Sequence, residues 1–452
     1  MSLLAIAWRY LLARPLVSLL TLLGVALGSA LVSLVLTLRA ETNRTFLAES
    51  QLVDCIVGAK GSPLQTVLSS VYHLDLPPGN IAYTELETLR KDFRVERAIP
   101  FALGDNYRGF RIVGTDESLP TLMINRLGGE DEEERPLFAL AEGRWGLDVP
   151  FEAVLGSTVA RETGLVMGST FHGTHGLLPI PGSAEHPEFP YTVVGILEPT
   201  GTSQDRAIFT RKDSVWVVHD AEKALHDRLF GTAQSTTPEP EVAAAEENPA
   251  PEETTELEAA WAFAPPSTEA TPRELTSILV QLRSSGLRYQ FAEEYTEKTN
   301  TLVAIPIREV QRLYTNFLQP MERTLLLVAY VVVVVAALSI LTGLYQAGER
   351  RRRDVAILRV LGARPREVMA IVLGEAALLS VFGTAAGWLL AQGALVVFQD
   401  WVAAQTGFAV RAFGWNAGEL MALLIVVGCG LLAGILPAWK AQGASLLQDL
   451  QS

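Results

Sequence analysis

The sequence predicts a membrane protein: four transmembrane α-helices carry a large extracytoplasmic α+β domain, which is inserted between the first two spans. Three observations indicate this fold class: four long uncharged apolar runs, a basic loop between two of them, and β-branched runs bounded by turn residues in the longest interval. The chain has 452 residues, of which 49% are hydrophobic, and its mean hydropathy is +0.25. This composition is too apolar for an ordinary soluble protein.

Each uncharged run is long enough to cross a bilayer, which takes ~20 residues in a helix. The runs cover residues 15–38, 324–348, 376–399 and 420–439, and the spans that we predict from them are 15–39, 323–348, 367–399 and 418–440. A cleaved signal peptide is an alternative for the first run. It is disfavoured because the run exceeds the usual ~7–15-residue core and leads directly into Arg39 and a polar helical pattern.

Basic residues near the spans predict the orientation, because they are retained on the cytoplasmic side. The N-terminal segment 1–14 carries Arg9 and Arg14, and the loop 349–366 carries seven arginines against two acids, whereas the loop 400–417 has only Asp400 and Arg411. We therefore expect segment 1–14, loop 349–366 and tail 441–452 inside. Residues 40–322 and the short loop 400–417 are expected outside.

The expected outer domain is strongly acidic. Residues 40–322 hold 43 of the 50 acidic residues and 23 of the 36 Lys plus Arg, a net charge of −20, whereas the rest of the chain has +6. This charge argues against nucleic acid as a partner. A disulfide between Cys55 and Cys429 is implausible from their positions beside and inside different spans, so we expect a hydrophobic core to hold the domain together.

Within the outer domain, turn-bounded apolar runs predict strands and the remaining periodic segments predict helices. The predicted strands are 53–57, 110–116, 151–160, 191–201, 214–220 and 276–286, with helices at 288–298 and 307–323. The second helix runs into the second span, so we expect two stalk helices. Segment 232–272, with nine Glu, seven Pro and no Lys or Arg, is predicted to be a disordered acidic insert.

The arginine-rich loop has a second feature, a short amphipathic pattern. Val355, Leu358 and Leu361 repeat every three residues, Ile357 lies beside them, and a helix stop is expected at Gly362. Anchoring to anionic membrane lipids would explain the arginines but not this apolar face. Docking into a groove of a soluble partner would explain both. The residues that we assign to coupling are Arg353, Asp354, Val355, Ile357, Leu358, Leu361 and Gly362.

Several stretches carry a resemblance to a known family. They are "AWRYLLARPLVSLLTLLGVALG", "VLGSTVARETGLVMGSTF", "YTVVGILEPTGTSQDRAIFT", "ERRRRDVAILRVLGARPREVMAIVLGEAALLSVFG" and "GILPAWKAQGASLLQDL". Together they resemble the FtsX-like or MacB-like permeases of ABC transporters, the mechanotransmission (type VII) class, over nearly the whole chain. The acidic insert departs from that pattern.

The resemblance implies a multi-pass permease of the bacterial inner membrane with a two-lobed periplasmic domain on stalk helices. It also implies a coupling helix in the arginine loop that docks on an ABC ATPase. The permease would pair with itself or a paralogue, and a periplasmic adaptor or lipoprotein is a further expected partner. Lipoproteins, lipids, peptides and small toxic compounds remain open as cargo.

The chain itself carries no recognisable nucleotide site. The pattern G-x-x-x-x-G-K-[ST] does not occur, and "GAKGS" at 58–62 lacks the spacing that cradles phosphate. We therefore expect a non-catalytic subunit without cofactors, with ATP and Mg²⁺ bound by a partner chain. The alternative function is a membrane sensor that passes a signal or force between partners without transport. A membrane-anchored hydrolase has no supporting residues.

Other polar and small residues have less specific interpretations. His172, His175, His186 and His219 lack zinc-like spacing and a catalytic-serine motif, so we expect turn residues, with no metal or catalytic site. Glu375 is the one acid expected near hydrocarbon depth, and an interfacial partner is favoured over an ion path. Three G-x-x-x-G patterns predict close helix packing at Gly24, Gly28, Gly383, Gly387, Gly430 and Gly434.

The orientation can be tested by cysteine labelling. In a cysteine-free background, we expect an impermeant maleimide to label Glu247→Cys in intact cells but Arg352→Cys only after lysis, because charge retains the arginine loop inside. Labelling of both variants after lysis controls for reactivity. The reverse pattern in intact cells would show that the orientation is wrong.

Overall fold

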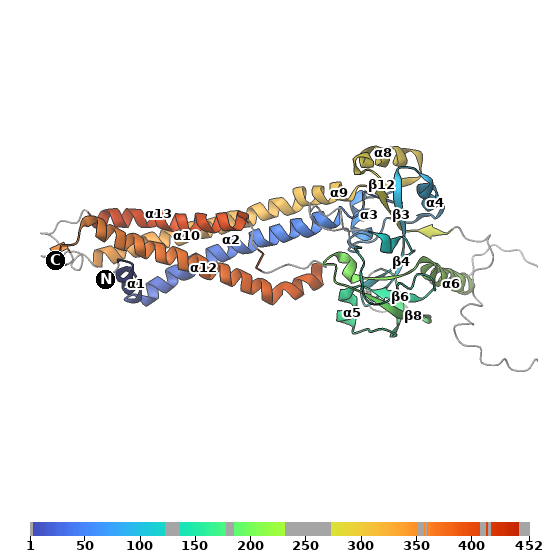
Figure 1. Cartoon of the computed structure of the whole chain (residues 1–452), viewed down its shortest axis with the longest axis horizontal. Coiled ribbons are helices and arrows are strands. Elements are labelled where there is room, and N and C mark those ends of the chain that lie inside the picture. Colours follow the sequence, from blue (N-terminus) through green and yellow to red (C-terminus); the bar gives the residue numbers. More distant parts are fainter. Residues whose placement is uncertain are drawn as a thin grey trace, which may run out of the picture. The chain divides into compact units, whose positions relative to one another are not determined.

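The computed structural model describes residues 3–122, 136–177, 185–230, 273–350, 357, 359–360, 362–406, 413–414 and 417–442. The chain divides into two compact units (Figure 1). The membrane unit comprises Met1–Thr45 and Leu313–Ser452, and the outer unit comprises Phe46–Arg312. The insert predicted at 232–272 lies outside the described residues.

The membrane unit is helical. Its helices are α1 (Leu3–Leu12), α2 (Pro15–Glu49), α10 (Gln319–Arg350), α12 (Pro365–Thr406) and α13 (Ala417–Gln442). By length and composition, four helical stretches can cross a membrane: Pro15–Arg44, Pro306–Gly348, Pro365–Gln399 and Ala417–Lys440. In Figure 1, α12 and α13 run side by side, and both α12 and α10 pack against α13. The four predicted spans are therefore present.

These long helices are apolar on their outward faces as well as on their packed faces. Val25, Val333 and Val426 belong to the buried cluster between them, whereas Leu20 and Leu327 are more than half exposed. In a water-soluble bundle the outward faces would be polar. A helix that is apolar on all sides is typical of a bilayer, where its own backbone hydrogen bonds satisfy every polar group.

The second stalk helix differs in detail from the prediction. Residues 307–323 are helical, but α9 (Pro306–Leu313) is followed by a π-helical segment, Tyr314–Leu318, before α10 begins. Pro320 lies in the first turn of α10 and cannot donate a backbone hydrogen bond. Local widening of the helix beside a proline is a common way to accommodate this lost bond.

The outer unit is built on one mixed sheet. Its strands are β1 (Cys55–Ala59), β3 (Val95–Tyr107), β4 (Phe110–Thr115), β5 (Leu140–Gly143), β6 (Glu152–Leu155), β7 (Thr170–His175), β8 (Glu185–Leu197), β9 (Ala207–Arg211), β11 (Ser277–Leu282) and β12 (Thr301–Ala304). The order is β12-β1-β11-β3-β4-β9-β6-β8-β5, with β7 pairing both β3 and β8. A separate pair joins β2 (Ile81–Ala82) and β10 (Glu274–Leu275).

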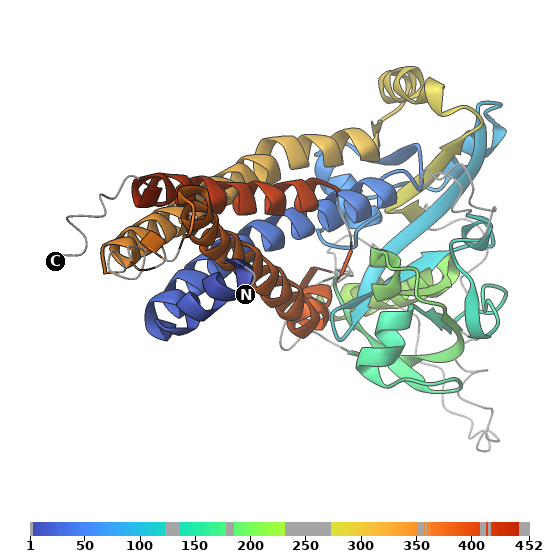
Figure 2. The same cartoon turned by 60° about the vertical axis from the view of Figure 1, so that its left-hand side comes forward.

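The long strand β3 connects two lobes. Its first part pairs with β11, and its later part pairs with β4 and β7, with a register shift between Leu103 and Asn106. In Figure 2, β3 is the long light-blue strand that runs through the sheet. The described helices of this unit are α3 (Pro63–Ser70), α4 (Thr84–Lys91), α5 (Ser157–Thr163), α6 (Lys212–Phe230), α8 (Arg288–Lys298) and α9.

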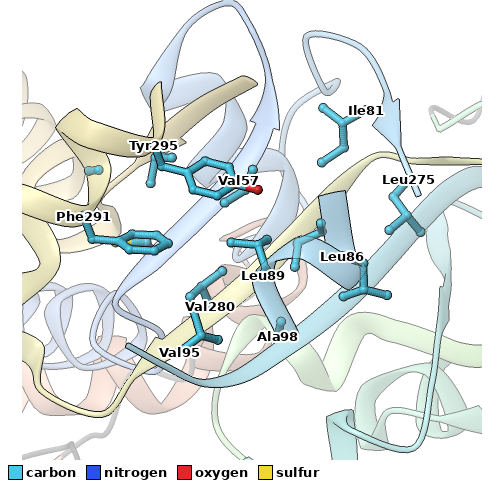
Figure 3. Close-up of a cluster of buried hydrophobic side chains, with 14 of the residues drawn as sticks. Val57, Ile81, Leu86, Leu89, Val95, Ala98, Leu275, Val280, Phe291 and Tyr295 are labelled. Atoms are coloured by element: carbon cyan, nitrogen blue, oxygen red, sulfur yellow. The ribbon is translucent and has the colours of Figure 1, made fainter. Parts of the chain in front are cut away.

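Each lobe has its own hydrophobic core. In the first lobe, Leu86 and Leu89 of α4 and Phe291 and Tyr295 of α8 pack with side chains of the sheet such as Val280 (Figure 3). In the second lobe, buried residues of β4, β6, α5, β7, β8 and β9 form a separate cluster. The expected α+β domain with two lobes is confirmed by these two cores on one sheet.

One predicted strand is wrong and a second is correct only in its first half. Residues 214–220 belong to α6, where Val215 and Val218, three positions apart, are both buried. In the predicted strand 151–160, β6 ends at Leu155, and Gly156 precedes α5, whose Val159 is buried. Both runs are short and β-branched. Such a composition is compatible with the two-residue repeat of a strand or the 3.6-residue repeat of a helix, and the surface on which the segment packs decides between them.

The end of α2 is held inside the outer unit by a buried acid. Glu49 accepts a hydrogen bond from the Ser203 backbone N–H at 2.9 Å, and the Ser203 hydroxyl also bonds to the Glu49 carboxyl. Nearby, the Tyr72 hydroxyl donates to the Phe46 carbonyl oxygen at 2.8 Å. Burial raises the pKa of Glu49 from 4.5 to about 8, outweighing the hydrogen bonds from Ser203, which lower it.

This raised pKa predicts a pH dependence of stability. The protonated Glu49 side chain stabilises the fold below pH 4.5, and this contribution is lost as the pH rises through about 8. We expect Glu49→Gln to remove this loss. The difference between its unfolding midpoint and that of wild type should therefore shift in favour of the variant as the pH rises from 5 to 9. Thermal unfolding of the full chain in detergent measures the midpoints. The exposed Glu87→Gln is the control, and a pH-independent difference for Glu49→Gln would contradict the prediction.

Candidate functional site

The described part of the arginine-rich loop presents apolar side chains outward. Ile357 and Val360 lie in a helical conformation three residues apart and are 47% and 67% exposed. The helical turn ends at Gly362, whose N–H donates to the Arg359 carbonyl oxygen at 3.1 Å and whose φ is +98°. Glycine adopts this left-handed conformation without strain, so it is well suited to end the helix here.

The next helix begins three residues after Gly362. Pro365 is the first residue of α12, and the Arg364 backbone N–H donates to the Glu367 carboxylate at 2.8 Å. Both features are typical of a helix start. Of the residues assigned to coupling, Ile357 and Gly362 are described, while Arg353, Asp354, Val355, Leu358 and Leu361 lie outside the described residues. The docking role of the set stays a prediction.

The six glycines of the G-x-x-x-G patterns all lie against neighbouring helices. A Cβ placed on Gly24 or Gly28 of α2 would lie 3.9 Å from the Ala336 Cβ or 3.3 Å from the Val333 side chain of α10. On Gly383 of α12 it would lie 2.7 Å from the Val25 Cβ of α2. Gly28 and Gly383 therefore allow backbones to approach closely, as small residues do in membrane helix pairs, whereas the contact at Gly24 is an ordinary van der Waals distance.

The other three glycines make similarly close approaches. A Cβ on Gly387 would lie 2.9 Å from the Ala30 backbone nitrogen of α2. On α13, a Cβ on Gly430 would lie 2.8 Å from the Ser380 Cβ, and one on Gly434 would lie 2.5 Å from the Ala376 Cβ, both on α12. Real side chains essentially never approach this closely, so substitution requires the helices to move apart.

One polar cluster in the membrane unit was missed by the sequence interpretation, which named Glu375 as the one acid at depth. Glu375 is buried, but so is Glu419 in the first turn of α13. The Ser33 hydroxyl of α2 and the Gln392 amide of α12 both donate to the Glu419 carboxylate, and these three polar residues link three helices. The sequence carried little signal, because Ser33 and Gln392 are two of several polar residues within the uncharged runs.

The four histidines are not turn residues, contrary to the sequence interpretation. His172 and His175 are on β7, His186 is on β8, and His219 is on α6. Local spacing gave no sign of this arrangement, because pairing between distant strands places these side chains. Asp105, His175 and His186 come close enough together to share a metal ion.

Comparison with family models identifies the class of protein, an ABC-type permease. A model described as the MacB-like periplasmic core domain matches residues 18–284, and one described as the FtsX-like permease C-terminal matches residues 326–446. The chain belongs to this FtsX-like and MacB-like permease family.

Two curated proteins are similar in sequence to this chain. The lipoprotein-releasing system transmembrane protein LolC of Neisseria meningitidis serogroup B is 27% identical over 149 residues, which cover 30% of this chain and 31% of LolC. The pyoverdine export ATP-binding/permease protein PvdT of Pseudomonas fluorescens is 26% identical over 448 residues, 96% of this chain. The chain spans 57% of the length of PvdT, so it corresponds to only part of each relative.

Two solved structures are also similar. The extracellular domain of the noncanonic ABC-type transporter YknZ from Gram-positive bacteria aligns with 56% of this chain and 98% of its own, at 10% identity and a TM-score of 0.27. The periplasmic region of MacB from Actinobacillus actinomycetemcomitans aligns with 58% of this chain and 94% of its own, at 10% identity and a TM-score of 0.30.

The helix contact at Gly387 can be tested against a matched glycine on the same helix. We expect Gly387→Ala to lower stability by roughly 1–3 kcal/mol, because the new methyl group overlaps α2. Gly393→Ala meets nothing within 4 Å and should be neutral or slightly stabilising, since alanine favours helix. Thermal unfolding in detergent compares the two variants. Equal midpoints would show that the close approach does not contribute to stability.

Proposed function

We propose that the chain is the membrane subunit of an ABC transporter, which couples ATP hydrolysis by a separate ATPase chain to movement of its own outer domain. The observation that carries the proposal is the exposed apolar turn in the arginine-rich loop. Its residues Ile357 and Val360 are exposed, and the loop connects α10 to α12 in the chain. Apolar anchors surrounded by basic residues suit a groove of a soluble protein. Membership of the permease family supports the same interpretation.

The chain connections suggest how movement could be passed on. The polypeptide enters the outer unit through α2 and leaves it through α9, the π-helical segment and α10. At the end of α2, Glu49 is fixed by Ser203, and at the start of α9 Ile307 packs against the hydrophobic core of the first lobe. Both helices are thus anchored in the outer unit, so that a displacement of either one is transmitted to the lobes.

A second permease subunit completes this proposal. Of the four candidate spans, the one that contains α10 has the smallest buried share, at 22%, and it exposes large apolar residues such as Val331 and Val335. We propose that α10 contributes to a contact with a second copy of the chain or with a paralogous permease. The rest of the apolar surface would contact lipids of the bacterial inner membrane, with the outer unit in the periplasm.

The names of the relatives indicate a broad class of cargo. LolC and PvdT are named for lipoprotein release and pyoverdine export, respectively. We propose export or extraction of a lipoprotein, lipid, peptide or small toxic compound, with a periplasmic adaptor or lipoprotein as a further partner. ATP and Mg²⁺ belong to the ATPase partner in this proposal.

The test is the exposed apolar turn itself. Ile357→Asp replaces an anchor with a carboxylate that docking would bury, and burying an unpaired charge costs several kcal/mol. We expect this variant to lose co-purification with the ABC ATPase that binds the wild-type chain, and to lose ATP turnover of the complex in nanodiscs. Membrane insertion should be unchanged, because the turn lies between the spans.

Arg351→Gln is the matched control, since it changes the charge of the loop and leaves Ile357 in place. Exposed rim charges contribute little to affinity, so this variant should bind nearly as wild type. If Ile357→Asp retains both binding and turnover, the loop acts only as a lipid anchor and the coupling proposal fails.

A further inference from the structure

Three side chains that could bind a metal meet on adjacent strands of the second lobe. Asp105 is on β3, His175 on β7 and His186 on β8, and their ligand atoms all lie within 4.8 Å of one another. The Nε2 atom of His186 is 3.7 Å from a carboxylate oxygen of Asp105. Asp105 and His175 are direct partners in the β3–β7 pairing.

The sheet explains why these residues meet. β7 pairs with β3 on one side and with β8 on the other, so it brings Asp105 together with His175 and His186, which lie 70 and 81 positions further along the chain. A short strand with two neighbours therefore creates the cluster.

A fourth imidazole lies beside the cluster. The His219 ring, on α6, has its centroid 6.0 Å from the centroid of the His175 ring. His219 packs directly over Gly104, the neighbour of Asp105. A Cβ at Gly104 would lie only 2.7 Å from the His219 Cε1 atom, so glycine leaves the space that this imidazole occupies.

Burial and access both suit a bound cation. Asp105 is fully buried and His186 is 7% exposed, so a carboxylate and an imidazole are withdrawn from water side by side. A buried carboxylate carries a large desolvation cost, and a divalent cation would offset it. His175 is exposed, which leaves a route for an ion from solvent.

We propose that Asp105, His175 and His186 bind a divalent transition metal, Zn²⁺ foremost, with His219 as the fourth ligand. Imidazole nitrogens and one carboxylate oxygen form a donor set that zinc accepts in tetrahedral geometry, at about 2.0–2.2 Å from each ligand. Such a geometry separates ligand atoms by roughly 3.4 Å. The three ligand atoms now lie within 4.8 Å of one another, so binding would draw them closer to each other by about 1 Å. The ion would join β3, β7 and β8 to α6, whose Val215 packs in the first-lobe core.

This site is independent of the proposed transport function, so its test requires no ATPase. Full-length protein in detergent is stripped with EDTA, exchanged into chelator-free buffer and titrated with ZnCl₂, and metal content is measured after gel filtration. We expect one Zn²⁺ per wild-type chain and a rise in the thermal unfolding midpoint with Zn²⁺ concentration, because a ligand that binds only the folded state stabilises it. Co²⁺ should give the visible absorption of a tetrahedral complex.

The key variant is His175→Ala, because this exposed position can be truncated without opening the core. It should retain the metal-free unfolding midpoint but bind Zn²⁺ more weakly than wild type, by more than the roughly 10–100-fold that loss of an outer-shell partner costs. His172→Ala is the control. It lies on the same strand, three residues away and outside the cluster, and it should bind Zn²⁺ as wild type does.

His219→Ala tests the fourth ligand, and it should weaken binding and change the Co²⁺ spectrum. An unchanged spectrum and affinity would overturn the assignment of His219 alone. The whole proposal is overturned if wild-type protein binds no stoichiometric Zn²⁺. It is equally overturned if His175→Ala binds Zn²⁺ as tightly as wild type.

Discussion

The membrane unit depends on a constraint imposed by hydrocarbon. Because lipid tails are as apolar as leucine, burying apolar surface between helices gains little there, and close packing has to hold the helices together. Small residues occupy the contacts for this reason. Gly387 and Ser29 meet between α12 and α2, and Gly430 and Ser380 meet between α13 and α12. Larger residues such as Val333 and Ile340 fill the space beside these close contacts.

The apolar surroundings also require the polar groups inside the bundle to find hydrogen-bond partners within the protein. Ser29 and Ser380 donate to backbone carbonyls of their own helices, so they add no unsatisfied group to an apolar interior. Glu419 instead accepts from Ser33 and Gln392 on two other helices. An acid that is held in this way fixes the mutual position of three helices, and it would resist any rearrangement that separates them.

The outer unit follows different rules, because water surrounds it and burial of apolar side chains stabilises it. Two separate cores form at the two parts of one sheet, and β3 belongs to both. The β3 register shift between Leu103 and Asn106 lies beside Gly104 and Asp105. The proposed metal site is therefore placed where β3 passes from its pairing with the first lobe to its pairing with the second.

The sequence by itself determined the features that depend on local composition: the four spans, the stop at Gly362 and five strands of the outer domain, β1, β4, β6, β8 and β11. It did not predict the long strand β3 or the short strands β5, β7, β9 and β12. Hydrocarbon selects length and apolarity, and both can be read from a continuous run of residues. Only the tertiary structure decided that 214–220 is helical, because the surface under Val215 and Val218 selects the period. It also decided that Asp105 meets His175 and His186, and that Ser33 meets Glu419, since strand register and helix packing join residues that are far apart in the chain.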